Sequence, residues 1–224
     1  LGSVLFQARL EVAKARAPFD RSYRLGPGDA AVIGRFALYC AATGRDREAL
    51  AAATHAAQLD PLNPLTQRAL GSVHFSARRY REAIPPLEAA LAGNPELGNC
   101  HALIGMCKLM MNDVNGARAE LVKESNALYR DTGLAIVDHR LHRQAEAEAA
   151  RARVSSGLGI GQLTLYQQAQ IAAQWQEIDQ CLSLLNDAYR SGDSGLIYTR
   201  NDPMLDPVRQ RVEFAHLLSA LGFA

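Results

Sequence analysis

The sequence predicts an all-α chain of helical hairpins stacked into one solenoid, and three observations lead to this fold class. Aromatic residues make up only 6% of the 224 residues, alanine is abundant, and alternation of β-branched with polar residues is almost absent, which favours helices over strands. Proline recurs every 34 positions, at Pro27, Pro61 and Pro95. Alanine and larger apolar residues keep the same period, as repeat architectures do.

The 34-residue period is carried by several residue types at once. Two series show it, namely Ala15, Ala49, Ala83 and Ala117, and Phe19, Ala53, Leu87 and Leu121. Independent residue types sharing one period indicate a structural unit that stacks on its neighbours.

Residues 64–97 show what one unit contains. We expect a first helix over 65–77, a turn at Arg78-Arg79 and a second helix over 80–92, which Asn94-Pro95 ends. The unit is therefore a helical hairpin.

Small residues mark the place where the two helices of this hairpin cross. Gly71 has no Cβ and Ala83 has only a methyl group, so the helices can approach closely. Leu70, Tyr80 and Leu87 are expected to fill the space around the crossing.

The first residues, LGSVLFQAR, return at Leu70–Arg78 as LGSVHFSAR, but with an offset of 69 rather than 68. We expect the one extra residue between Arg9 and Ala15, because a turn can absorb it, whereas in a helix it would rotate one face by about 100°. Residues 1–9 then form the second half of a first helix, and the sequence is expected to be a piece of a longer chain.

The period breaks and resumes in the second half of the chain. Ala147 follows Ala117 by 30 residues and Cys181 follows Ala147 by 34. Two more hairpins are expected, with the helices 128–141 and 143–154, and 163–175 and 177–190. The Gly-rich stretch 155–161 is expected to be a flexible linker rather than a phosphate loop, since it follows a helix and no Lys-Ser/Thr follows it.

The end of the sequence predicts a capping helix. Asp206 is expected to cap a helix from Pro207 to Leu221, because proline loses no hydrogen bond at the first helical position. Its inward side chains would be Phe214, Leu217, Leu218 and Leu221. The predicted division of the single solenoid, 1–224, is a truncated repeat 1–29, repeats 30–63, 64–97 and 98–127, hairpins 128–161 and 162–192, and a turn with capping helix over 193–224.

These units resemble the tetratricopeptide repeat (TPR). The residues that carry the resemblance are Leu-Gly, Tyr, Ala, Leu, Ala and Pro in LGSVHFSARRYREAIPPLEAALAGNP, preceded by FALYCAATGRDREALAAATHAAQLDP and followed by LIGMCKLMMNDVNGARAELVKES. The resemblance implies an α-α superhelix of about five hairpins plus a capping helix.

The terminal region resembles a narrower group, bacterial signalling proteins in which a TPR array follows a class III adenylate/guanylate cyclase or a winged-helix output domain. Asp202-Pro203, Asp206-Pro207 and Leu221-Gly222-Phe223 match that pattern, while Arg211–Phe214 departs from its usual Asp-Pro-Arg-Phe. The resemblance implies a regulatory array that serves an output domain, which none of this sequence resembles.

Charge and cysteine usage limit the function classes. Twenty-four Lys/Arg and 23 Asp/Glu are spread along the chain, which argues against nucleic acid as a partner, and no run of 18 apolar residues suggests a membrane span. The cysteines are spaced for neither a disulfide framework nor a metal site, so a reduced cytoplasmic setting is expected.

The sequence shows no set of residues typical of an enzyme. His139 and His142 straddle a predicted turn and are expected to be solvated, while Cys100 and Cys107 lie on one apolar helical face and are expected to be core. We expect a non-catalytic chain with no cofactor and no metal.

Recognition is expected on the concave face, where the first helix of each pair lies. The predicted groove is apolar and Met-rich, suits a protein or peptide partner with an apolar segment, and lacks the basic clamp that some TPR proteins use to grip carboxylates. Its residues are Leu38, Arg68, Ser72, Phe75, Met106, Leu109 and Met110.

Several alternatives stay open for this face. Its apolar residues could be core, or another part of the same protein could cover them. The function expected first is protein association or control of an attached output domain, and the alternative is a small-molecule or peptide sensor that changes pitch on binding. Near-neutral charge and an apolar groove also permit a homodimer.

Overall fold

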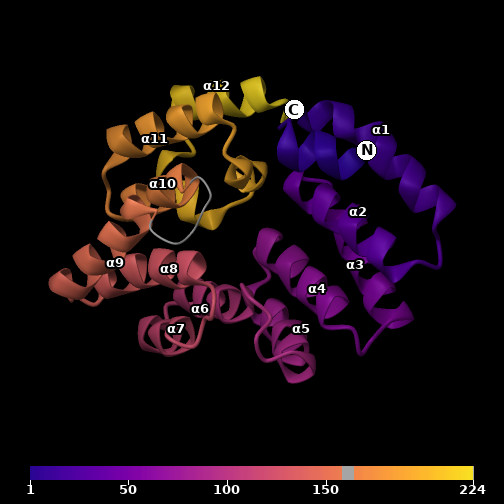
Figure 1. Ribbon diagram of the computed structural model, residues 1–224, viewed down its shortest axis with the longest axis horizontal. Helices are drawn as coiled ribbons and strands as arrows, with labels where there is room; N and C mark the ends of the chain where they lie inside the picture. Colours follow the sequence, from indigo (N-terminus) through magenta and orange to yellow (C-terminus); the bar gives the residue numbers. More distant parts are fainter. Residues whose placement is uncertain (158–163, 224) are drawn as a thin grey trace.

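The computed structural model describes residues 1–157 and 164–223, which form an arc of antiparallel helix pairs (Figure 1). Those residues contain helices and connecting turns and no strand. The elements are η1 (Val4–Ala8), α1 (Val12–Leu25), α2 (Ala30–Ala42), α3 (Asp46–Leu59), α4 (Pro64–Ser76), α5 (Tyr80–Gly93), α6 (Cys100–Met110), α7 (Val114–Leu121), α8 (Ala127–Arg140), α9 (Gln144–Ser156), α10 (Leu165–Gln174), α11 (Ile178–Ser191), η2 (Ser194–Tyr198), η3 (Pro203–Val208) and α12 (Val212–Leu221).

The pairs are arranged as the all-α superhelix prediction requires. The first helices α2, α4, α6, α8 and α10 contact one another in succession along the inner side of the arc, and the second helices lie outside them (Figure 1). The six helices predicted over 65–92, 128–154 and 163–190 begin and end within two residues of α4, α5 and α8 to α11. The predicted linker 155–161 begins within α9 and extends into 158–163, which lie outside the described residues.

The turn inside each pair is built in the same way. One residue adopts a left-handed conformation with positive φ, which lets the chain reverse after the first helix. These residues are Leu10, Gly44, Arg78, Asn112, His142 and Gln176. They are 34 residues apart, except for the step of 30 from Asn112 to His142, so the turns follow the period of the sequence.

The extra residue of the first unit lies in the helix and not in the turn, so that prediction is wrong. Leu10 and Arg78 are 68 residues apart, in register with the other turns. Residues Val4–Ala8 instead form a π-helix, in which the Arg9 amide donates to the carbonyl oxygen of Val4, five residues earlier. A π-turn takes up one residue more than an α-turn, which accommodates the insertion without shifting the turn.

The helix crossings use the small residues that the sequence singles out. A Cβ on Gly71 would lie 2.5 Å from Leu87 Cγ and 3.1 Å from the Ala83 carbonyl oxygen. Ala83 and Leu87 are fully buried. The close approach of α4 and α5 therefore depends on the absence of a side chain at position 71.

The C-terminal end differs from its prediction. Asp202, and not Asp206, caps the helical segment that begins with a proline, since its Oδ1 accepts from the Met204 amide at 2.8 Å and η3 begins at Pro203. The final helix α12 begins only at Val212. Of its predicted inward residues, Phe214, Leu217 and Leu221 are buried and Leu218 is half-buried.

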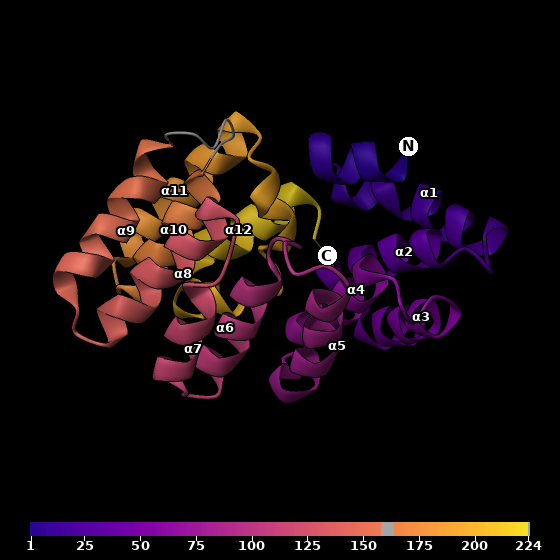
Figure 2. The same ribbon diagram turned by 60° about the horizontal axis from the view of Figure 1, so that its bottom comes forward.

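The segment 193–211 closes the arc by running from α11 along the inner side to the first pairs (Figure 2). Arg78, in the turn between α4 and α5, forms a two-pronged ion pair with Asp206, at 2.7 and 2.6 Å. The Asn201 amide donates to the Ala41 carbonyl oxygen at the end of α2. One hydrophobic cluster contains both Phe19 on α1 and Leu185 on α11, so the first and last pairs share a core.

Candidate functional site

The open part of the inner side carries five side chains from three first helices and from η2, which we call the inner patch. They are Leu38 on α2, Arg68 and Ser72 on α4, Tyr129 on α8 and Tyr198 on η2. Leu38 is 38% exposed and the others except Tyr198 are half-buried. The patch therefore combines apolar and aromatic surface with one cation.

Tyr198 lies beside Tyr129 and Arg68. It is 54% exposed, yet desolvation raises the pKa of its phenol, the neighbouring Tyr129 raises that pKa further, and the Arg68 guanidinium lowers it. Desolvation, the adjacent phenol and Arg68 together show that these three side chains lie near one another. The Arg68 Nη1 also donates to the Gly98 carbonyl oxygen at 3.2 Å, which holds the guanidinium in place.

The seven predicted groove residues differ in how accessible they are in the structure. Leu38, Arg68 and Ser72 are accessible on the inner side. Leu109 is 1% exposed and belongs to the core, because α6 is covered there by neighbouring helices. The remaining three are half-buried against core clusters, namely Phe75, Met106 and Met110.

The inner side of the last pair is occupied by the chain itself. Asp202 Oδ2 accepts from the Tyr166 hydroxyl at 2.6 Å and from the Gln170 amide at 2.5 Å. The Gln174 amide donates to the Met204 carbonyl oxygen at 2.7 Å, and the Met204 side chain is buried. Tyr166, Gln170 and Gln174 are four residues apart, so they lie on one face of α10.

This occupied face and the inner patch are equivalent in the repeat. Arg68 and Ser72 precede Tyr166 and Gln170 by 98 residues each, which is the sum of the spacings 34, 30 and 34 between the turns of their pairs. The positions that hold an Asp-Pro-Met segment on α10 are therefore the positions that lie open on α4. Arg68 there presents a cation where Tyr166 presents a hydroxyl.

The carboxylate in the occupied face is deeply buried. Burial raises the pKa of Asp202, against the hydrogen bonds from Tyr166, the Met204 amide and Gln170, which lower it. Burial and the adjacent Asp202 raise the pKa of Tyr166 well above its ordinary value, so its hydroxyl stays protonated and donates. The inner side of this fold can thus bind a carboxylate with neutral donors.

Sequence reasoning missed Tyr129 and Tyr198. Tyr129 on α8 is the repeat equivalent of Leu65 on α4, because it follows Leu65 by 64 residues, the sum of one 34-residue and one 30-residue repeat. A strict 34-residue period therefore does not place Tyr129 on the inner face. Tyr198 lies in the segment 193–206, which the sequence presents as a turn and which has no repeat equivalent. The one signal for Tyr198 in the sequence is that it is an aromatic residue among small polar ones.

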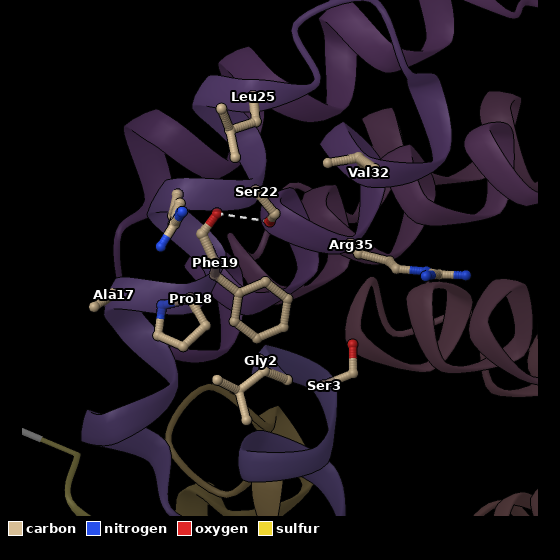
Figure 3. A pocket seen from close by; sticks show the side chains of 11 residues that line it. Gly2, Ser3, Ala17, Pro18, Phe19, Ser22, Leu25, Val32 and Arg35 are labelled. Carbon is tan, nitrogen blue, oxygen red and sulfur yellow. Dashed lines mark hydrogen bonds between the residues drawn. The ribbon is translucent and has the colours of Figure 1, made fainter.

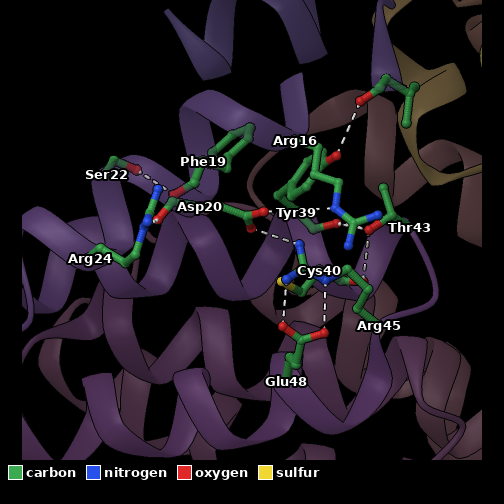
Figure 4. A network of polar contacts seen from close by, with 11 residues as sticks. Arg16, Phe19, Asp20, Ser22, Arg24, Tyr39, Cys40, Thr43, Arg45 and Glu48 are labelled. Atoms are coloured by element: carbon green, nitrogen blue, oxygen red, sulfur yellow. Dashed lines mark hydrogen bonds and ion pairs between the residues drawn. The ribbon is translucent and has the colours of Figure 1, made fainter. Parts of the chain in front are cut away.

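A second polar cluster joins the first two pairs and is structural (Figure 4). Arg45 donates to Asp20 on α1 at 2.9 Å and to Glu48 on α3 at 2.9 Å, and its guanidinium lies over the Phe36 ring. The Arg45 hydrogen bonds lower the pKa of Glu48. All polar groups of the cluster are engaged with one another, so it fixes the angle between pairs.

His139 and the cysteines are accounted for by packing. The prediction that His139 is solvated is wrong, because it is half-buried and stacks on Trp175 with ring centroids 4.5 Å apart, whereas His142, the positive-φ residue of its turn, is exposed. All four cysteines are buried, and burial raises the pKa of Cys100 to about 11 and that of Cys107 to about 12. Within residues 1–157 and 164–223, no three His, Cys, Asp or Glu side chains gather as metal ligands. No helix in the described part of the chain is long and apolar enough to cross a membrane.

Comparison with solved structures identifies the fold. PilF of Pseudomonas aeruginosa is similar over 89% of this chain and 92% of its own, with a TM-score of 0.59 and 18% identity. A tetratricopeptide repeat protein from Parabacteroides merdae matches 97% of this chain and 88% of its own, with a TM-score of 0.55 and 13% identity. A chain of the APC/C hetero-tetramer Cut9–Hcn1 matches 98% of this chain and 48% of its own, with a TM-score of 0.58 and 11% identity.

The paired helices, the inner and outer layers and these similarities define the chain as an all-α TPR-type solenoid. No protein-family model and no curated protein matches it.

Proposed function

We propose that the chain is a non-catalytic scaffold that binds a short protein segment along the inner patch. The observation that carries the proposal is the Asp-Pro-Met segment held by Tyr166, Gln170 and Gln174 on the equivalent face of α10. A surface that already binds one short segment, Asp202 with the first turn of the 3-10 helix η3, can bind another short segment where it is open.

The inner patch defines the chemistry of the segment. Leu38, Tyr129 and Tyr198 offer apolar and aromatic contacts, and Arg68 occupies the position that receives a carboxylate on α10. The preferred partner is therefore a short segment in which an Asp or Glu lies one or two residues from an apolar side chain.

Selection from a random peptide library tests this specificity. Peptides selected on the wild-type protein should share an acidic residue beside apolar ones, and Arg68→Glu or Leu38→Asp should weaken their binding by about tenfold or more, because each removes a contact at the centre of the patch. Fluorescence anisotropy with labelled selected peptides measures the affinities.

Two matched controls make the outcome decisive. Arg81→Glu changes the same charge on the exposed side of α5, and Leu62→Asp changes a leucine that is 90% exposed outside the patch. Both should bind like the wild type, and all variants should keep the wild-type circular dichroism spectrum. Selected peptides that bind the Arg68 and Leu38 variants as tightly as the wild type would contradict the proposal.

We also propose that the scaffold works in the cytoplasm as the regulatory part of a bacterial signalling protein with an adenylate cyclase-like or winged-helix output domain. The support is the Asp-Pro, Asp-Pro and Leu-Gly-Phe motif of the terminal region. Two of its residues build the end of the solenoid, since Asp202 caps η3 and Gly222 ends α12 with φ of 79°. Sequencing the gene upstream of Leu1 tests this assignment, which requires an output domain to be encoded there.

A further inference from the structure

The segment that lies on α10 is a capped helical turn. The Asp202 carboxylate uses both oxygens, since Oδ1 accepts from the Met204 amide at 2.8 Å and Oδ2 accepts from the Tyr166 hydroxyl at 2.6 Å. Pro203 follows the cap as the first residue of η3, a position where proline loses no hydrogen bond. One aspartate therefore caps its own turn and also binds the helix that receives the turn.

Met204 is the apolar anchor of this turn. Its side chain is 2% exposed and belongs to the hydrophobic cluster that contains Ile136 on α8 and Ile171 on α10. Its carbonyl oxygen accepts from the side-chain amide of Gln174. Together, α8 and α10 thus provide donors for the aspartate and an apolar surface for the residue two positions later.

The helices α2 and α4 repeat this arrangement 98 residues earlier, with the offset that relates Arg68 to Tyr166. The equivalent residues are Leu38 for Ile136, Arg68 for Tyr166, Ser72 for Gln170 and Ser76 for Gln174. Ile136 is 1% exposed, whereas Leu38 is 38% exposed. The apolar position is therefore covered on α8 and open on α2.

The open position belongs to the inner side of α2 and not to its side toward α1. Val32 and Arg35 line a separate hollow with Phe19 on α1, and Leu38 does not line it (Figure 3). Arg35 is exposed there. A variant of Arg35 therefore changes the charge of α2 outside the face that α2 and α4 share.

Arg68 suits a carboxylate better than a tyrosine does. A guanidinium carries five N–H groups, and its hydrogen bond among the described residues, to the Gly98 carbonyl oxygen, engages one of them. Charge-assisted hydrogen bonds are about twice as strong as neutral ones. A carboxylate at this position is therefore bound by charge as well as by hydrogen bonds.

We propose that the α2 and α4 face binds a capped turn of a separate protein with the order Asp-Pro-apolar. One carboxylate oxygen of that aspartate accepts from the amide two residues later, the other accepts from Arg68, and the apolar side chain packs on Leu38. The inference rests on the proposed function and adds the order of the residues, the turn and a preference for Asp. Glu is not among the residues that form such a cap.

Four peptides that differ in one feature each test the turn. They carry Asp-Pro-Met-Leu, Glu-Pro-Met-Leu, Asn-Pro-Met-Leu or the reversed Leu-Met-Pro-Asp between identical flanking residues. In fluorescence anisotropy, the wild-type protein should bind the Asp peptide about fivefold more tightly than the Glu and reversed peptides. The Asn peptide keeps the cap but lacks the charge, so it should also bind about fivefold more weakly.

Each contact has its own receptor variant. Arg68→Tyr installs the α10 residue and should reduce the preference for Asp over Asn to about twofold, whereas Arg35→Tyr should leave it at about fivefold. Changing the peptide Met to Ala should weaken binding about fivefold in the wild type and in Leu62→Ala, but only about twofold in Leu38→Ala, because a double-mutant cycle couples groups that touch. All variants should keep the wild-type circular dichroism spectrum.

The outcomes separate this inference from the proposed function. Equal affinities for the Asp, Glu and reversed peptides, all weakened by Arg68→Glu, would overturn the capped turn while the proposed function stands. An equal effect of the peptide Met change in Leu38→Ala and the wild type would remove Leu38 as the apolar contact and overturn the inference in the same way. Peptides whose affinity depends on neither Arg68 nor Leu38 contradict the proposed function, and the inference fails with it.

Discussion

Single side chains at the helix crossings decide whether the pairs can form. Gly71 is the clearest case, since a methyl group there would lie 2.5 Å from Leu87 Cγ and 3.1 Å from a backbone oxygen that cannot move away without bending α5. The sequence predicts this residue because small residues keep the 34-residue period. The period arises because every helix pair packs in the same way.

Gly71→Ala should lower the free energy of unfolding by about 1–2 kcal/mol. Overpacking of a core costs about 1–3 kcal/mol, and the better helix propensity of alanine returns at most about 1 kcal/mol. Urea denaturation followed by circular dichroism measures the change. Gly28→Ala is the matched control, because a Cβ there meets no atom within 4 Å, and it should leave the midpoint unchanged. Equal midpoints for the two variants would contradict the packing argument.

Most helix ends are explained by the capping residues and prolines next to them. Asn63 and Pro64 start α4 as a cap and a first helical residue, a signal that can be recognised in the sequence. The same signal is ambiguous at the C-terminal end, because Asp202-Pro203 and Asp206-Pro207 carry it equally. The structure uses the first, since Arg78 and Arg209 engage Asp206 instead.

The cap of α8 also controls the inner patch. Asn126 Oδ1 accepts from the Leu128 and Tyr129 amides at 3.0 and 3.3 Å. Asn126→Ala should lower the free energy of unfolding by about 1 kcal/mol, because two amide groups lose their acceptor. It should also weaken peptide binding at the patch, since Tyr129 lies in the loosened turn.

Asn126→Asp keeps an acceptor and serves as the control for this prediction. Thermal melts compare the stability of both variants, and the anisotropy assay compares their affinity. A loss of affinity in Asn126→Asp equal to that in Asn126→Ala would show that the cap does not position Tyr129.

At the scale of the whole molecule, the closed arc was not predictable. Repeat periodicity constrains a pair only against its neighbours, whereas Arg78 and Asp206 are 128 residues apart and Asn201 and Ala41 are 160 apart. The sequence left open whether the concave face is accessible or covered. In the structure Leu38 and Arg68 are accessible on α2 and α4, whereas the segment 193–211 covers the inner side of α10.

The ion pair that closes the arc should give a pH-dependent contribution to stability. Burial raises the pKa of Asp206, but hydrogen bonds and charge from Arg78 and Arg209 lower it further, so its native pKa is below the unfolded value of about 3.9. The stabilisation is present above the unfolded pKa and is lost as the pH falls through the native one.

Asp206→Asn therefore should cost at most about 1 kcal/mol near neutral pH, because both partners are more than a third exposed. The difference in stability between wild type and variant should shrink below about pH 4, as the carboxyl of the wild type protonates. Urea melts at a series of pH values measure it. A difference that stays constant down to pH 2 would show that the charge of Asp206 does not stabilise the arc.

The closure also changes how the molecule responds to force. A solenoid whose pairs contact only their neighbours extends gradually when pulled, like a spring. Here the chain returns on itself, and a Cβ on Gly222 would lie 3.5 Å from the Cβ of Ala13. Tension applied to the two ends therefore loads the Arg78–Asp206 contact and the shared core before it stretches any helix pair, so the molecule should resist small forces as a stiff ring and then yield abruptly.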